Sequence, residues 1–297
     1  MKFNFLKYKN ISFIFSGILV LASILSLFIF GLKPGIDFTG GSILELNYQG
    51  DRPSLQEIRD SLSLIDLGEI QIQPAGEKGM ILRMKDIGEE MHQEVISKLK
   101  EGREAEELRF ESIGPTISKE LGEKTNVVVA LSLLVIVLYI AFAFRSLNYP
   151  ARSWQYGLAS LLGLIYNVLI PLGFFSILGY FYGLQISIPV IVALLTVVGY
   201  TINDTIVIFD RIRENSAKKR NAKYEDIVND SISQTFSRSI AASLTTLLTV
   251  TAIYIWGGET LKSFSLALIL GIFFGTFSSI FLVMPSLAAW LKWRKKI

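Results

Sequence analysis

Val197–Arg213 reads VVGYTINDTIVIFDRIR, and it places a carboxylate inside an apolar run that begins near Pro189. Asp204 precedes Arg211 by seven residues, which is roughly 10 Å along a helix that rises about 1.5 Å per residue. A charged side chain at such depth in a membrane costs roughly 2.5–3.5 kcal/mol on insertion scales. The default interpretation of such a residue is functional, so Asp204 is the candidate centre of this chain.

The composition indicates an integral membrane protein with one soluble insert. Of 297 residues, 51% are hydrophobic, and most of the acidic residues gather between positions 33 and 125. The absence of Cys excludes disulfides, thiolate metal sites and Cys nucleophiles. The one His, His92, lies in the soluble segment, so proton chemistry inside the membrane would have to use carboxylates. The formal charge of +3 does not suggest a nucleic-acid partner.

Hydropathy predicts six transmembrane helices. The first, about 11–32, is longer than the apolar region of a signal peptide and lacks a clear cleavage site, so we expect an uncleaved span. An amphipathic lead-in helix is expected over 116–125. Pro171 is expected to kink the third span, and Pro285 to interrupt the sixth. The remaining spans are predicted at 126–144, 156–178, 188–210, 233–256 and 264–290.

The insert predicts a small α+β domain. Alternation indicates strands at 42–48, 69–73, 79–85 and 106–113, with the turn 74–76 between the middle two. Helices are expected from Leu55 and over 88–100. The order β-α-β-β-α-β is typical of a ferredoxin-like unit. His92 is expected on a solvated helix face rather than in a metal site. The predicted division is therefore 1–32 for the N-terminus and first span, 33–115 for the soluble domain, and 116–297 for a five-helix bundle.

Basic residues predict the orientation. They cluster before the first span, between the second and third (Arg145 and Arg152), after the fourth, and at the C-terminal end. The positive-inside rule places all of these in the cytoplasm, together with both termini. The insert would then lie outside, which in a bacterium is the periplasm.

Arg238 is the candidate partner of Asp204. It opens the fifth span at a comparable depth, and an acid and a base on consecutive antiparallel helices are candidate partners. The alternative is an interfacial arginine that snorkels to the headgroups.

Burial disfavours the charged form of the Asp204 carboxylate, and the nearby Arg238 guanidinium favours it. A helix shift that separated the two would therefore promote protonation of Asp204. Alternating access would then carry protons across. Sodium stays open, because Asn203, Thr201 and Thr205 also offer oxygen ligands.

The flanking residues are interpreted as packing and boundary features. Arg238 begins a stripe of mainly small residues that is expected to let helices approach closely; it continues through Ala241, Ala242, Thr245 and Thr249. Gly271 and Gly275 are interpreted in the same way on the sixth span. Asp210 and Arg211 lie at the membrane edge and are expected to take part in interfacial ion pairs.

A glycine-rich segment follows the first span and reads GIDFTGG over Gly35–Gly41. Gly35, Asp37, Gly40 and Gly41 indicate irregular backbone, a tight turn that leads into the first strand. No Lys-Ser/Thr pair follows, so a phosphate-binding loop is not favoured.

These motifs together carry a family resemblance. GIDFTGG, the segment NDTIVIFDRIREN from Asn203, and Gln234-Thr235 with Arg238 resemble the SecD/SecF family of bacterial protein-export membrane proteins, and within it the SecF branch. The family belongs to the resistance-nodulation-division (RND) superfamily. Departures are small: Thr201 stands where Ser is frequent, and Ser239 and Ala242 where Thr is frequent.

The resemblance implies a function that composition alone does not. It implies a subunit that acts with SecD beside the SecYEG translocon, with SecA and YidC nearby. The proton-motive force would drive the later stage of preprotein export across the inner membrane. Asp204 and Arg238 match the family's membrane aspartate and arginine.

Two alternatives stay open. One is a lipid or small-molecule exporter half of the same superfamily, although an insert of this size leaves little room for a substrate cavity. The other is a passive scaffold, for which Asp204→Asn would change nothing. An enzyme is not expected, and no cofactor is predicted, because no nucleophile elbow, metal cluster or catalytic carboxylate pair occurs.

Overall fold

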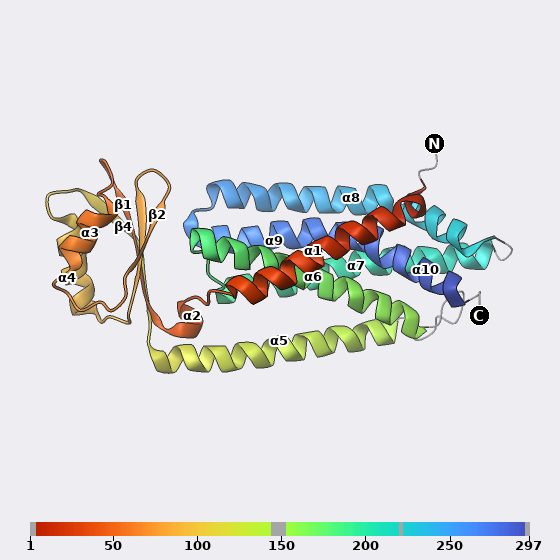
Figure 1. The fold of residues 1–297 in the computed structure, drawn as a ribbon, viewed down its shortest axis with the longest axis horizontal. Coiled ribbons are helices and arrows are strands. Elements are labelled where there is room, and N and C mark those ends of the chain that lie inside the picture. The colour runs from red at the N-terminus through yellow and green to blue at the C-terminus, as the bar shows by residue number, and fades with distance from the viewer. Residues whose placement is uncertain (1–3, 144–152, 220–221, 295–297) are drawn as a thin grey trace. The chain divides into compact units, whose positions relative to one another are not determined.

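The computed structural model describes residues 4–143, 153–219 and 222–294. The chain forms two compact units, one of Met1–Lys33 with Val128–Ile297 and the other of Pro34–Val127. The first unit is helical and the second contains the sheet, and Figure 1 shows the elements of both. The basic residues Arg145 and Arg152, on which the orientation partly depends, lie outside the described residues.

The helical unit consists of long apolar helices and two short helical segments, η1 and η2. In chain order they are η1 (Phe5–Tyr8), α1 (Lys9–Phe30), α5 (Pro115–Ala143, which begins in the sheet unit), α6 (Ser153–Tyr182), α7 (Ile188–Lys218), α8 (Tyr224–Trp256), α9 (Glu259–Ser278), η2 (Ser279–Val283) and α10 (Met284–Arg294). In the part of the chain that the structure describes, six helices are long and apolar enough to cross a membrane. The predicted class, a six-span polytopic membrane protein, is confirmed.

Several helix boundaries differ from the prediction. The lead-in helix and second span form the single helix α5, because no proline or strong helix breaker separates them. Helices α7 and α8 extend as amphipathic turns beyond the apolar runs. In the sixth span the irregularity precedes Pro285: Ser279–Val283 forms a π-helical turn. Proline offers no N–H to the preceding turn, and a π turn accommodates the break.

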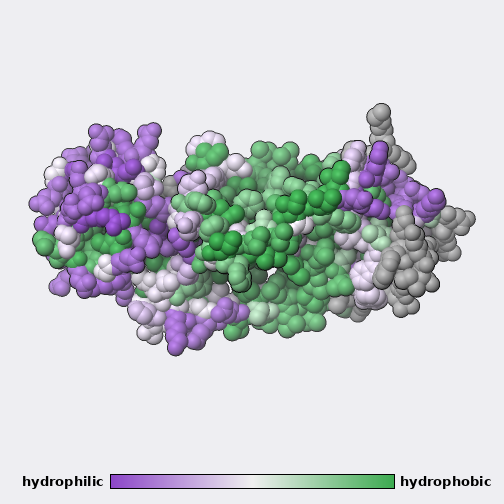
Figure 2. Space-filling view, viewed as in Figure 1, coloured by the Kyte–Doolittle hydropathy of each residue, from purple (hydrophilic) through white to green (hydrophobic). Residues whose placement is uncertain are grey.

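Helices α7 and α9 approach closely at two glycines. A Cβ on Gly271 would lie 2.4 Å from Val197 Cγ2, and a Cβ on Gly275 would lie 2.1 Å from Thr201 Cγ2. Any larger residue would therefore force the helices apart. The outward side chains of the bundle are mostly apolar, and Figure 2 shows hydrophobic colour over the helices and mainly hydrophilic colour over the sheet unit.

The sheet unit has the predicted ferredoxin-like order. It runs α2 (Ile36–Thr39), β1 (Gly41–Tyr48), α3 (Leu55–Leu62), β2 (Gln71–Ala75), β3 (Gly79–Met84), α4 (Glu89–Lys100) and β4 (Ala105–Ile113). The four strands pair antiparallel in the order β2-β3-β1-β4. Leu44 pairs with Leu82 on one side and Phe110 on the other, and all three pack in the core under α3 and α4. Pro74 and Ala75 belong to β2 rather than to a turn.

The expectation that His92 lies on a solvated surface is wrong. The side chain is 4% exposed and stacks on Phe110, with ring centroids 3.6 Å apart. Its Nε2 lies 3.2 Å from Glu107 Oε1 on β4. The acidic neighbours of His92 on α4 suggested solvent, but β4 brings an aromatic ring and a carboxylate over that turn of the helix.

The glycine-rich segment forms one helical turn, α2, rather than a simple tight turn. Gly40 and Gly41 follow it with φ of 72° and 124°, a region that side chains with a Cβ rarely adopt. A Cβ on Gly41 would also lie 2.7 Å from the Met84 carbonyl oxygen. Gly41 is therefore required where β1 begins against β3.

Candidate functional site

Helix α7 carries the candidate carboxylate among apolar neighbours. Pro189 stands in its first turn, where the missing N–H has no cost. Asp204 is 7% exposed, and the adjacent turns bury Val197, Ile202 and Ile208. The sequence thus builds an uninterrupted apolar helix and places one carboxylate inside its packed face.

The Asp204 carboxylate is incompletely paired. Its Oδ2 is buried and has no hydrogen-bond partner among the described residues. The side chains that act on it electrostatically, Arg238 and Ser239, both come from α8. Within the described ranges, no salt bridge of 4.0 Å or less joins Asp204 to Arg238. A buried polar atom without a partner lowers the stability of the fold. Such an atom is therefore a candidate functional group.

The other predicted oxygen ligands point elsewhere. The Thr201 hydroxyl donates to the Val197 carbonyl at 2.9 Å and accepts from Asn167 Nδ2 at 2.8 Å. The Thr205 hydroxyl contacts Ser279 Oγ at 3.1 Å and donates to the Thr201 carbonyl. Asn203 is exposed. The structure therefore does not gather these oxygens with Asp204 into a cation cage.

Arg238 lies on an exposed face of α8. The same face carries Ala241, Ala242, Thr245 and Thr249, all exposed in this chain. The predicted close approach of a helix to this stripe stays a prediction, because the stripe is exposed in the single chain. The face of α8 that the bundle buries carries Thr235, Ser239 and Ser243 instead. The small-residue stripe thus lies on the exposed side of α8 in this chain.

Asp210 and Arg211 lie in different polar contacts at the far end of α7. Asp210 Oδ1 pairs with Arg213 Nη2 at 2.6 Å. Arg211 Nε donates to Gln234 Oε1 of α8 at 2.6 Å, and Gln234 also accepts from Asn215 Nδ2 at 3.0 Å. Arg211 thereby links α7 to α8, whereas Asp210 pairs within its own helix.

Sequence reasoning missed a buried amide and a hydroxyl cluster behind α7. Asn167 of α6 is 3% exposed and accepts from Ser278 Oγ at 2.6 Å. Together with Thr201 and Ser278 it forms a polar contact between α6, α7 and the end of α9, and Ser279 of η2 adds a hydrogen bond to the Thr201 carbonyl. The signal was present, because an Asn near the middle of the third span is as unusual as a mid-span Asp.

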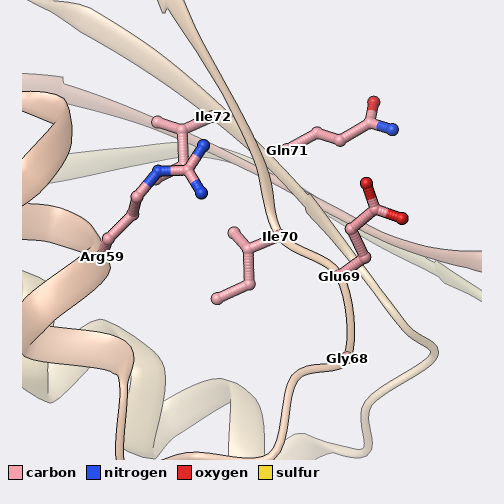
Figure 3. A pocket seen from close by; sticks show the side chains of 6 residues that line it. All are labelled: Arg59, Gly68, Glu69, Ile70, Gln71 and Ile72. Carbon is pink, nitrogen blue, oxygen red and sulfur yellow. The ribbon is translucent and has the colours of Figure 1, made fainter.

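The sheet unit has a separate open pocket of about 570 Å³ beside α3 and β2. It is lined by Arg59 and by residues 68–72. Figure 3 shows Arg59 extending from α3 toward Ile72 and Ile70 pointing into the pocket, whereas Glu69 and Gln71 point away. Ligand sites need polar groups that converge, so this pocket is not the candidate site. No cluster of three or more potential metal ligands occurs in the residues described.

The fold and the buried carboxylate define a class, that of multi-pass membrane proteins with a small ferredoxin-like domain between the first and second spans. The family comparisons narrow this class. Residues 93–293 match the family "Protein export membrane protein SecD/SecF, C-terminal", and residues 25–51 match the SecD/SecF GG motif. The chain belongs to the SecD/SecF family of protein export membrane proteins, as its SecF-type subunit.

Named relatives agree with this assignment. The protein translocase subunit SecF of Thermobaculum terrenum is 35% identical over 97% of this chain and 93% of its own. SecF of Desulfurispirillum indicum is 38% identical over 96% and 91%. The crystal structure of SecDF from Thermus thermophilus, a translocon-associated membrane protein, matches with a TM-score of 0.85 and 34% identity. That match covers 99% of this chain and 39% of the SecDF chain.

Proposed function

We propose that this SecF-type subunit couples the proton-motive force to preprotein export, with Asp204 as the group that takes up and releases the proton. The observation that carries the proposal is the buried, unpartnered Oδ2 of Asp204 within electrostatic reach of Arg238. A charge that crosses the membrane releases roughly 2.3 kcal/mol per 100 mV. Separation of Asp204 from Arg238 would favour proton uptake, and their approach would favour release.

The contacts of the neighbouring oxygens favour a proton over sodium. The hydroxyls of Thr201 and Thr205 are engaged with backbone carbonyls and with neighbouring helices, and Asn203 is exposed. A sodium ion would need several of these oxygens to turn toward Asp204 together, whereas a proton needs only the carboxylate.

We further propose that SecD covers the exposed face of α8 that carries Arg238. The relative SecDF is a longer chain of which this protein matches 39%, so a separate SecD would supply the rest. Small residues on that face would let a helix of SecD approach closely. Introducing Trp at Ala241 should therefore reduce the SecD that co-purifies. Trp at Val135, on the exposed surface of α5, is the control and should not.

The complex would lie in the bacterial inner membrane with both termini in the cytoplasm, as the basic clusters indicate. The SecYEG translocon would then be a neighbour, with SecA and YidC as further partners. The translocating preprotein would be the substrate reached from the periplasmic side.

The proposed coupling can be tested by measuring the export of a preprotein into inverted membrane vesicles. These vesicles contain SecD and the translocon. Asp204→Asn and Arg238→Met should lose the stimulation that an imposed proton gradient gives, while the complex still assembles. Asp210→Asn is the matched control, because it removes an exposed carboxylate from the same helix. A sodium gradient alone should not stimulate export.

The competing function is that of a passive scaffold. It requires Asp204→Asn to respond to the proton gradient as the wild type does, with equal amounts of assembled complex. That result would overturn the coupling proposal and leave Asp204 as a structural residue.

A further inference from the structure

Ser239 differs from most buried hydroxyls of the bundle. In α7 and α8, Thr201, Thr205, Ser216, Ser231 and Thr235 each donate to a backbone carbonyl three or four residues earlier. Such back-bonding fixes the hydroxyl proton. Ser239 is 2% exposed, and among the described residues its Oγ has no hydrogen-bond partner. Its proton is therefore not fixed by back-bonding and can turn toward Asp204, on which the hydroxyl acts.

The hydroxyl of Ser239 and the Oδ2 atom of Asp204 are parts of the same site. Ser239 is the side chain of α8 whose hydroxyl acts on the Asp204 carboxylate. Two buried polar atoms on neighbouring helices, which act on each other and have no further partner among the described residues, are candidates for proton exchange or for holding a water molecule.

A pair of hydroxyl groups lies one turn further along α8. Ser243 Oγ lies 2.6 Å from Thr276 Oγ1 of α9, and both residues are buried. Within the described contacts, neither hydroxyl bonds to a backbone carbonyl. Residues four apart on a helix have Cβ atoms about 5–6 Å apart, so one water molecule can bridge Ser239 and Ser243.

We propose that Asp204 exchanges its proton through Ser239, and that the Ser243–Thr276 pair carries the proton onward toward the Gly257 end of α8. This inference rests on the proposed proton coupling. Protonated Asp204 gives its proton to Ser239 Oγ, and Ser239 releases its own hydroxyl proton to the bridging water. The water in turn passes a proton to Ser243. Asp204 is left as a carboxylate, and Ser239 is unchanged.

The surroundings of Asp204 contain few other charges. Helix α8 contributes Arg238, the one charged group that acts on Asp204 in the described part of the chain. The segments of α6, α9 and η2 behind α7 present Asn167, Ser278 and Ser279, which are polar but uncharged. A change at Ser239 would therefore act on proton exchange without altering the charges around Asp204.

The test is gradient-driven export into inverted vesicles across a series of external pH values. Ser239→Ala should lower the gradient-stimulated rate by at least about tenfold, the low end of the range for a hydrogen bond to a charged group, and shift its pH profile. Ser239→Thr keeps the hydroxyl and should restore both. Ser216→Ala removes the same atom from an equally buried serine whose hydroxyl donates to the Ile212 carbonyl, and should behave as wild type.

Two results would overturn the inference. One is a wild-type rate and pH profile in Ser239→Ala. The other is an equal loss in Ser239→Ala and Ser239→Thr with normal complex assembly, because the hydroxyl would then not be the active feature. Asp204→Asn, measured in the same vesicles, separates the two proposals. If it loses stimulation while Ser239→Ala does not, only the route through Ser239 fails. If Asp204→Asn itself responds normally, the proton coupling fails.

Discussion

Gly275 of α9 lies directly against Thr201 of α7, so that a Cβ at position 275 would stand 2.1 Å from Thr201 Cγ2. Thr201 also accepts a hydrogen bond from Asn167 of α6. The helix that carries Asp204 thus contacts two neighbouring helices one turn from the carboxylate.

Gly275→Ala is expected to destabilise the bundle by roughly 1–3 kcal/mol, because the added methyl overpacks the α7–α9 contact. The thermal midpoint of the purified protein in detergent measures this. Thr201→Ser removes Cγ2 and keeps the hydroxyl, so adding it to Gly275→Ala should recover part of the loss. Gly199→Ala, where nothing lies within 4 Å, should be neutral or stabilising. A loss at Gly275 as small as at Gly199 would contradict the close contact.

Gly41→Ala is expected to destabilise the sheet unit by roughly 1–3 kcal/mol, because Ala is strained at a φ of 124°. Its methyl would also meet the Met84 carbonyl. Hydrogen exchange of β1 and β3 amides in increasing urea measures the effect. Gly50→Ala has open space around it and serves as control. Equal protection in both variants would show that β1 tolerates a side chain at its first residue.

His92→Ala is expected to cost the sheet unit roughly 2–4 kcal/mol, because it leaves a cavity against Phe110. His92→Phe keeps an aromatic stack and should cost less. The urea midpoint for exchange of the α4 amides measures both. Gln93→Ala, an exposed neighbour, should change the midpoint little. If His92→Ala matched Gln93→Ala, the imidazole would be solvated after all.

The ion pair between Glu57 and Arg103 should make the sheet unit's stability depend on pH. The Arg103 guanidinium, 2.6 Å from Glu57 Oε2, holds the pKa of Glu57 below its usual range. The unfolded chain therefore binds this proton more readily, so the stabilisation is present above the usual glutamate range and disappears as pH falls through the lowered value.

Glu57→Gln should accordingly lower the urea midpoint at neutral pH, and the difference from wild type should vanish in acid. The effect will be small because both side chains are exposed. Glu94→Gln provides the comparison on the exposed surface of α4. A difference that persisted unchanged in acid would show that Glu57 acts by packing and not by its charge.

Much of the fold could be predicted from local patterns. Apolar runs predicted the spans because hydrocarbon demands a continuous apolar helix, and alternation predicted the four strands. Boundaries failed where local signals were weak: α5 continues through the expected lead-in helix, and the π turn at Ser279–Val283 precedes the proline that suggested an interruption. His92 failed because its partners, Phe110 and Glu107, come from a distant strand.

The sequence by itself determined that Asp204 is a carboxylate inside an apolar helix. Its depth in the membrane follows from its distance along the chain to Arg211, and the free-energy cost of placing a charge there follows from that depth. Which groups act on it was decided by tertiary structure. Arg238 was foreseen from its depth, but Ser239 was not, since the buried face of α8 depends on how that helix rotates against α7 and α9. The same rotation turns Ala241, Ala242 and Thr245 outward. Helical periodicity gives the angles between side chains, and only packing fixes which of them face the neighbouring helix.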